Sequence, residues 1–456
     1  MIRAKIDPDS LTSEQLYTLV DEYMKSDQYA SYMKAQAYYE GRHEILDRPA
    51  GSANTEVNNT IVNNFPGYIV DVNVGYFLGN PVAYTSGEKE ADLLEQIQEI
   101  FDLNDEQNVN MELGKTNAIK GRSYELIYAD EEANPRFAPI QPENLILIYN
   151  TSVEPKPLCA IRFWLVPDLF EDEETLHIVL YTDTQIINYV GIGDSLTEDS
   201  RESHAFGMVP VVEYINNDER QGDFDKVITL VDAYDKVQSD TANDFESFAD
   251  AFLLIRNMSG TEESDLDDMR RKRAILVDDD GDAKWLVKDV NDNAQENYRE
   301  RIEADIHRFS LTPNLTDEKF AGNVSGVALA YKLWGLEQNA AQKERKFKKS
   351  LQQRLKLISN FLGVKGKDID YQNISLNFSR NAPPALPELV EIVTKLKDFV
   401  SDETLLAFLP FVDDPAEEQD RLEVQRGTTI DLDKFPNPIR DSEYMTEPDE
   451  AEEEIQ

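Results

Sequence analysis

The first 120 residues carry apolar side chains at the three-to-four-residue spacing that is typical of amphipathic helices. This spacing predicts five helices, over Leu11–Tyr23, Asp27–Tyr39, Phe65–Leu78, 88–103 and 105–120. The second helix is expected to place four side chains on one face, Tyr29, Tyr32, Met33 and Ala37. Asn64 is a suitable cap for the third helix, and Pro66 stands in its first turn, where a missing N–H breaks no helical bond.

Short runs of β-branched and aromatic residues, bounded by turn formers, follow these helices and predict strands. The runs are Tyr124–Ala129, Leu145–Tyr149, Leu158–Val166, Leu176–Tyr181 and Gln185–Val190, with a shorter one at Val82–Thr85. Helices followed by strands in one stretch predict an α+β domain over residues 1–215.

Residues 225–309 have the pattern of two helices separated by an insert. The first helix begins at Asp225, and its apolar stripe consists of Val227, Leu230, Val231, Tyr234, Thr241, Phe245, Phe248 and Phe252. The second covers Asp292–Phe309 and carries Tyr298, Ile302, Ile306 and Phe309 on one side. The second helix can return alongside the first, which predicts a helix–insert–helix hairpin.

The insert itself is predicted to be compact. It opens with a strand over Phe252–Arg256 and continues with a short helix whose acids precede its bases, the order that the helix dipole favours. A hairpin of Ala274–Val277 with Ala283–Val287 is expected to close it. The acidic turn at 278–282 has part of a calcium-loop pattern, but Val287 stands where the twelfth position needs Glu, so we interpret it as a hairpin turn.

After a loop rich in turn formers, one very long helix is predicted over Gly326–Leu362. Its narrow stripe consists of Leu329, Leu333, Leu336, Ala340, Phe347, Leu351, Leu355, Ile358 and Leu362, and Gly335 is a weak point inside it. Three shorter helices follow the Pro383–Pro384 break, over Pro387–Phe399, over Ser401–Phe408 and up to about Gln425. The last sixteen residues hold eight acids and no base, which predicts a mobile tail.

The chain of 456 residues is strongly acidic, with 89 acidic against 45 basic residues and a net charge of −44. Sequence-independent DNA binding needs Lys and Arg, so this composition excludes a protein that grips DNA over its whole surface. Two interpretations stay open: a solvated acidic exterior, or an acidic surface that stays near DNA without adhering to it. No apolar run reaches the roughly 18 residues that span a bilayer, and the N-terminus lacks the pattern of a signal peptide.

Catalytic and metal-binding patterns are incomplete wherever they begin. His43-Glu44 starts a zinc-helix motif, but Asp47 stands where the second His belongs, so we interpret His43 as a satisfied residue on a surface turn. The four histidines are not at ligand spacing from one another, and the single cysteine, Cys159, excludes an intrachain disulfide and a thiolate cluster. This cysteine usage favours a reducing cytoplasm. We expect no enzyme, no metal and no cofactor.

One stretch departs from the acidic character of the chain, since Lys343 to Lys356 holds seven basic residues and one acid. Five of them are candidates for a contact, Lys343, Arg345, Lys346, Lys348 and Lys349. On a helical wheel the basic residues avoid the apolar stripe. They either pair with acidic neighbours, including those of another subunit, or contact DNA phosphate.

Several segments, taken in their order along residues 35–360, resemble the siphovirus-type family of tailed-bacteriophage portal (head–tail connector) proteins. They are Tyr38–Ile45, Asn63–Phe65, Tyr68–Asp71, Gly75–Pro81, Asp240–Phe245, Gly322–Leu329, Trp334–Gln338 and Lys343–Arg345. The resemblance implies a ring, usually of twelve subunits, at one capsid vertex, through which the terminase motor pumps double-stranded DNA. It also implies contacts with the terminase large subunit, major capsid and scaffold proteins and a head-completion adaptor protein, in the virion and, during assembly, in the host cytoplasm.

The resemblance further implies a predominantly helical portal-type fold whose parts can be placed on this chain. They are a wing (1–224), a first stem helix (225–252), a clip (253–290), a second stem helix (291–310), a tunnel loop (311–325), a long helix returning to the wing (326–382), a crown (383–440) and an acidic flexible tail (441–456). The implied DNA-facing residues are Leu315, Thr316, Asp317, Glu318, Lys319, Phe320, Ala321, Gly322, Asn323, Val324 and Ser325. The implied clip residues facing terminase and connector are Glu262, Asp265, Arg270, Arg271, Lys272 and Arg273.

Two other functions compete with this one. A hydrolase or nuclease acting on phage DNA could assemble a site from distant carboxylates, and magnesium-dependent cleavage would identify it. An adaptor or scaffold protein of another viral assembly would never enclose DNA, whereas a closed ring with an axial hole would support the portal.

Overall fold

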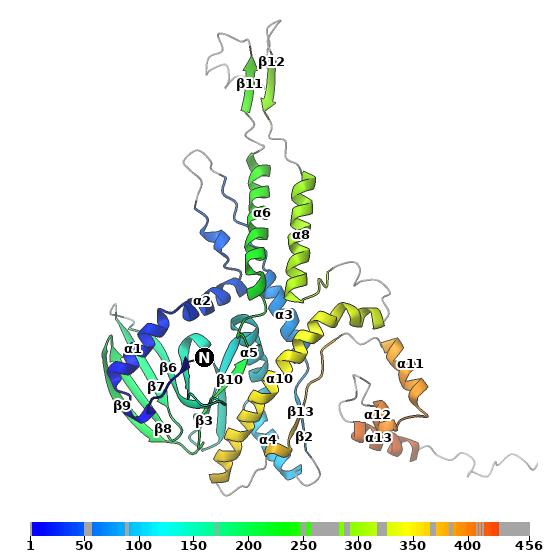
Figure 1. Ribbon diagram of the computed structural model, residues 1–456. Coiled ribbons are helices and arrows are strands. Elements are labelled where there is room, and N and C mark those ends of the chain that lie inside the picture. Colours follow the sequence, from blue (N-terminus) through cyan, green and yellow to red (C-terminus); the bar gives the residue numbers. More distant parts are fainter. Residues whose placement is uncertain are drawn as a thin grey trace, which may run out of the picture. The chain divides into compact units, whose positions relative to one another are not determined.

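The computed structural model describes residues 2–49, 57–86, 91–168, 170, 173–247, 252–256, 282–286, 292–316, 326–364, 371–382, 386–406, 409, 412 and 415–427 (Figure 1). It has a mixed α and β architecture and divides into two compact units, Met1–Ala382 and Pro383–Gln456. Among the described residues, no helix is both long and apolar enough to cross a membrane.

A six-stranded sheet and two helices form the first part of the larger unit. The strand order is β1-β5-β6-β7-β8-β9, with β1 parallel to β5 and every other pair antiparallel. The strands are β1 (Ile2–Arg3), β5 (Leu145–Tyr149), β6 (Pro157–Pro167), β7 (Glu174–Tyr181), β8 (Gln185–Ile192) and β9 (Ser195–Ser203). The helices α1 (Ser13–Met24) and α2 (Asp27–Tyr39) supply Leu16, Val20 and Tyr32 to a core shared with this sheet.

The buried face of α2 differs from the predicted one. Tyr32, Ala35 and Tyr38 are buried, whereas Met33 is 47% exposed. The predicted bounds of α2 are confirmed because Ser26 caps it, accepting a hydrogen bond from the Tyr29 amide. The face is rotated because α2 packs against α1 on one side and α3 and α5 on the other.

A second, three-stranded sheet has the order β10-β3-β4 and faces part of the first sheet across a shared core. Its strands are β3 (Arg122–Ala129), β4 (Pro135–Ile140) and β10 (Val211–Ile215). The sequence pattern predicted β3 but missed β4, β9 and β10. Both β4 and β9 are edge strands. An edge strand tolerates the two prolines of β4, and it also tolerates the polar sequence of β9, which lacks apolar alternation.

Three helices connect the sheets to the rest of the unit, α3 (Phe65–Leu78), α4 (Ala91–Leu103) and α5 (Glu106–Lys120). The predicted bounds of α3 are confirmed, and the Asn64 side chain caps it by accepting the Gly67 amide at 2.9 Å. A Cβ on Gly67 would lie 2.7 Å from the Asn64 amide nitrogen, so a larger residue at 67 would displace the capping side chain.

The helix–insert–helix hairpin is present, with corrections at its distal end. After a turn at Asp225–Val227, α6 covers Ile228–Ser247 and packs beside the antiparallel α8 (Asp292–Ser310) (Figure 1). Phe252 belongs to the strand β11 (Phe252–Arg256), not to the helix, and β11 pairs with β12 (Asp282–Leu286). The predicted partner strand, 274–277, and the short charged helix lie outside the described residues. Three predicted stripe residues are exposed by more than half, Phe245, Tyr298 and Phe309.

The long helix is confirmed as α10 (Gly326–Val364), and seven residues of its predicted stripe are buried, Leu336, Ala340, Phe347, Leu351, Leu355, Ile358 and Leu362. They share a core with α3, α4, α5 and the three-stranded sheet. Beyond α10, β13 (Ser375–Asn377) pairs antiparallel with β2 (Ala83–Thr85), which returns the chain to the N-terminal part.

The smaller unit is helical where it is described. It contains α11 (Leu386–Leu396), α12 (Asp402–Leu406) and α13 (Pro415–Gly427), close to the three predicted helices. The predicted acidic tail, 441–456, lies outside the described residues.

Candidate functional site

The two helices α6 and α8 meet through a core that also includes α3. Val227, Val231, Ile302 and Ile306 are buried in it. Tyr234 on α6 packs edge-on against Phe65, with ring centres 5.0 Å apart. Hence both α6 and α8 pack against α3.

The chain leaves α8 through a short segment, residues 311–316, which we call the loop root. Leu311 adopts a left-handed backbone, with φ of 59°, and turns the chain out of the helix. The Tyr68 hydroxyl on α3 donates to the Pro313 carbonyl and accepts from the Leu315 amide, both at 2.8 Å. One hydroxyl therefore fixes two points of the loop root.

A second anchor of the loop root is Thr312, which is completely buried. Its hydroxyl accepts from the Asn73 amide at 2.8 Å, and Asn73 in turn accepts from Asn339 on α10 at 2.8 Å. The Thr312 carbonyl can only accept, so the His307 Nδ1 that lies 3.0 Å from it carries the proton. Residues of α3 and α8 thus bond this threonine directly, and α10 reaches it through Asn73.

An open cavity of about 280 Å³ lies beside the loop root. Asn63, Phe65 and Tyr68 line it from one side, and Glu303, His307 and Thr316 from the other. Of the predicted DNA-facing residues the structure describes Leu315 and Thr316, both exposed, and Leu315 is 46% exposed. Residues 317–325, and the clip residues Glu262 to Arg273, lie outside the described residues.

The basic stretch on α10 is divided between internal ion pairs and an exposed face. Lys343 pairs with Asp223 where both side chains are buried, and Lys346 lies 2.5 Å from Asp218. Lys348 donates to the Leu376 carbonyl at 3.2 Å. Arg345, Lys349 and Lys356 are exposed and have no partner among the described residues. Three cations of this stretch are therefore left without a counter-charge in the described part of the chain.

Arg354, the remaining base of this stretch, is completely buried. Its Nη1 donates to Glu106 at 2.7 Å and its Nε to Glu125 at 3.0 Å, while Nη2 lies 2.6 Å from Glu125 but is poorly aligned for a hydrogen bond. The Tyr84 and Tyr214 hydroxyls donate to these two carboxylates at 2.5 and 2.8 Å. The guanidinium also stacks over Phe137 at 4.6 Å, so a buried polar network joins α10 to α5, β2, β3 and β10.

The interpretation of His43 as a surface residue is wrong. His43 is 2% exposed and stacks on the Tyr38 ring. Its Nδ1 lies 2.5 Å from the Asp235 carboxylate on α6, and its Nε2 lies 3.1 Å from the Tyr38 carbonyl. Both ring nitrogens are thus within hydrogen-bonding distance of oxygens, and the ring ties α6 to the end of α2.

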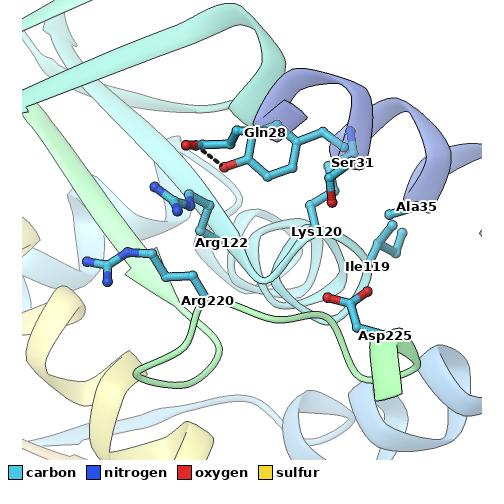
Figure 2. Close-up of a pocket in the computed structure, with 9 residues that line it drawn as sticks. Gln28, Ser31, Ala35, Ile119, Lys120, Arg122, Arg220 and Asp225 are labelled. Atoms are coloured by element: carbon cyan, nitrogen blue, oxygen red, sulfur yellow. Dashed lines mark hydrogen bonds between the residues drawn. The ribbon is translucent and has the colours of Figure 1, made fainter. Parts of the chain in front are cut away.

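A polar cavity of about 130 Å³ lies between α2, α5 and the turn before α6, and Figure 2 shows the residues around it. Three bases line it, but each has a carboxylate partner: Lys120 bonds Glu143 at 2.7 and 2.9 Å, while Arg122 and Arg220 share Glu213. Burial raises the pKa of Asp225 on the opposite wall. The charges of this cavity are thus compensated within the chain, which is typical of a structural polar interior.

No catalytic arrangement is found in the part of the chain that the structure describes. Burial raises the pKa of the Cys159 thiol to about 12, so the thiolate nucleophile is absent at neutral pH. No three His, Cys, Asp or Glu side chains of the described residues are grouped so as to hold a metal ion.

Sequence reasoning missed the residues that anchor the loop root, Tyr68, Asn73, Thr312 and Asn339. Each is an ordinary helix or loop residue in the sequence, and their partners lie more than 230 positions away along the chain. The only signal was that Tyr68 falls inside one of the segments that resemble portal proteins.

Comparison with known proteins identifies the family. The profile of the phage portal protein family, SPP1 Gp6-like, matches residues 21–431. The portal protein of Bacillus phage SPP1 is 27% identical over 424 residues, covering 88% of this chain and 81% of that protein. The portal protein of Clostridium phage phiCD119 is 26% identical over 422 residues, covering 86% and 91%.

Among solved structures, a chain from the "neck of empty GTA particle computed with C6 symmetry" has a TM-score of 0.48 and 11% identity, and the match covers 75% of this chain and 88% of that one. At this level of similarity it supports no functional assignment. The chain belongs to the phage portal protein family of the SPP1 Gp6-like type. As a phage portal protein it is a component of the virion.

Proposed function

We propose that twelve copies of this chain form a closed ring at one capsid vertex, through which double-stranded DNA is packaged by the terminase motor and later ejected. The ring guides DNA and catalyses no reaction. The observation that carries this proposal is the packing around α3 in a chain of the portal family. The helices α6 and α8 pack against α3, and the loop root is hydrogen-bonded to it.

We assign the parts of the ring subunit as the family resemblance implies. The wing corresponds to residues 1–224 with the return over 326–382, the stem to α6 and α8, the clip to 253–290 and the crown to 383–440. The loop over 311–325, which continues from the anchored root, is the element that projects toward DNA. The clip meets the terminase large subunit and the head-completion protein, and the ring also has major capsid and scaffold proteins as partners.

The acidity of the chain favours a channel through which DNA slides, rather than a surface that binds DNA tightly. A net charge of −44 per subunit makes any channel wall that is not selectively basic repel a polyanion. Because tight phosphate contacts would have to be broken at every step, a repulsive wall lets DNA slide.

The ring is tested by the mass of the purified protein in native mass spectrometry, together with negative-stain images. We expect one closed species with an axial hole and a mass near twelve times 52.1 kDa. A stable monomer would overturn the proposal, and a ring of another subunit number would correct only its stoichiometry.

We assign Arg345, Lys349 and Lys356, the cations of the basic stretch that have no partner among the described residues, to a carboxylate-rich surface of the neighbouring subunit. The other cations of this stretch pair with carboxylates or a carbonyl of their own chain, and acids outnumber bases 89 to 45. Contact with DNA phosphate is the alternative, and the two make different predictions.

Reversing two charges, in the double variant Arg345→Glu and Lys349→Glu, is expected to weaken the ring without altering subunit stability, because neither side chain has a partner among the described residues of its own subunit. Sedimentation at increasing dilution measures the first effect and thermal unfolding the second. If rings stay intact and only DNA packaging falls, the DNA alternative is correct.

A further inference from the structure

An unusual segment precedes α3. Residues 57–63, which we call the strap, belong to no sheet, yet three of their backbone amides are bonded to side chains of α6 (Figure 1). The Asn63 amide donates to Asp235 at 2.7 Å, the Ile61 amide to Ser239 at 2.9 Å and the Asn59 amide to Asn243 at 2.7 Å.

The spacing of these bonds determines the conformation of the strap. The acceptors stand at every fourth residue of α6, which is a rise of about 6 Å. The donors stand at every second residue of the strap, and two residues of extended chain span about 6.6 Å. The two repeats match, so the strap is extended and presents the amides of its odd-numbered residues to the helix.

Successive amides of an extended chain point to opposite edges, so the amides of Asn58, Thr60 and Val62 point away from α6. None of these three backbone N–H groups has a hydrogen-bond partner among the described residues; the Asn58 side chain donates to the Arg48 carbonyl. Their carbonyls point the same way, because N–H and C=O of one residue share an edge in an extended chain. With respect to the described residues, the outer side of the half-buried strap is therefore equivalent to an unpaired edge of a β-sheet.

The composition of the strap lacks the features that protect a free edge. Its seven residues include no charge and no proline, in a chain of which 29% is charged. Four of them are β-branched, Val57, Thr60, Ile61 and Val62. Exposed edges are normally protected by charged residues, proline or bulges, and an unprotected edge is a template for strand addition.

We propose that the outer edge of the strap binds an extended segment of the neighbouring subunit by β-type backbone hydrogen bonds. This inference rests on the proposed ring, which places a second copy of the chain next to each subunit. The strap would then join two subunits, since its inner edge holds α6 of its own chain and its outer edge holds the neighbour.

Hydrogen–deuterium exchange with residue-level fragmentation tests the proposal on the full chain, comparing the ring with the subunit at a concentration too low for assembly. We expect the amides of residues 58, 60 and 62 to exchange at least about tenfold more slowly in the ring. The amides of 59, 61 and 63 are expected to be protected in both states. Equal exchange of the outer amides in both states would overturn the proposal.

A matched pair of variants separates the two edges. Thr60→Pro removes an outer N–H and is expected to raise the dissociation constant of the ring about tenfold, with unchanged melting of the subunit. Ile61→Pro removes the inner N–H bonded to Ser239, and lowers the melting temperature of the subunit itself. If Thr60→Pro leaves the ring unchanged, or destabilises the subunit as Ile61→Pro does, the outer edge is not an intersubunit contact. Absence of any ring for the unaltered protein would instead refute the proposed function.

Discussion

Arg354→Ala is expected to destabilise the folded subunit by about 3–5 kcal/mol, because it leaves two buried carboxylates without their cation. Glu106 is 3% exposed and Glu125 is fully buried, so water cannot take the place of the guanidinium. Urea unfolding followed by circular dichroism measures the loss. A change below about 1 kcal/mol would contradict the network as described.

Two companion variants make this measurement specific. Lys356→Ala lies on the same helix but is exposed and unpaired among the described residues, so its effect is expected to stay within about 0.5 kcal/mol. The triple variant Arg354→Met, Glu106→Gln and Glu125→Gln removes all three charges together. It should regain much of the stability lost in Arg354→Ala, since neutral groups of similar volume are far less costly to bury.

Replacing residues 317–322 by two glycines is expected to leave rings intact and to reduce DNA-filled heads to background. The loop root holds the start of the loop through Thr312 and Tyr68, so the shortened chain still leaves α8 in the same direction. What is lost is the part that we assign to contact with DNA. In vitro packaging, measured as nuclease-protected DNA, is the assay, and normal packaging would remove the tunnel-loop assignment.

Tyr68→Phe is a milder variant that tests the same loop. It keeps every loop residue and removes only the hydroxyl that bonds Pro313 and Leu315. We expect intact rings and an intermediate fall in packaging, because the loop root keeps its Thr312 anchor. Ring images of both variants separate a packaging defect from an assembly defect.

Helices were predictable where local signals agree. The bounds of α2 and α3 match the prediction because Ser26 and Asn64 begin these helices with cap hydrogen bonds that depend only on neighbours three residues away. The stripe of α10 was also predictable, since its apolar residues repeat over many turns.

The failures share a cause, which is pairing with distant residues. His43 is buried because its partner, Asp235, lies 192 positions away on another helix. The buried face of α2 is set in the same way by its contacts with α1, α3 and α5. Neither arrangement leaves a local trace in the sequence. The same holds for the candidate site, where Tyr68 meets Pro313 across 245 positions, so sequence reasoning located the loop but not what holds it.

Cys159 has a practical consequence for all these experiments. It is the only cysteine of the chain, it is fully buried in the six-stranded sheet, and its raised pKa suppresses the reactive thiolate. Maleimide reagents are therefore not expected to react with Cys159 in the folded protein. A single cysteine introduced at an exposed position, such as Val153→Cys, would take up a fluorophore or cross-linker alone, so distances between subunits can be measured without first removing a native thiol.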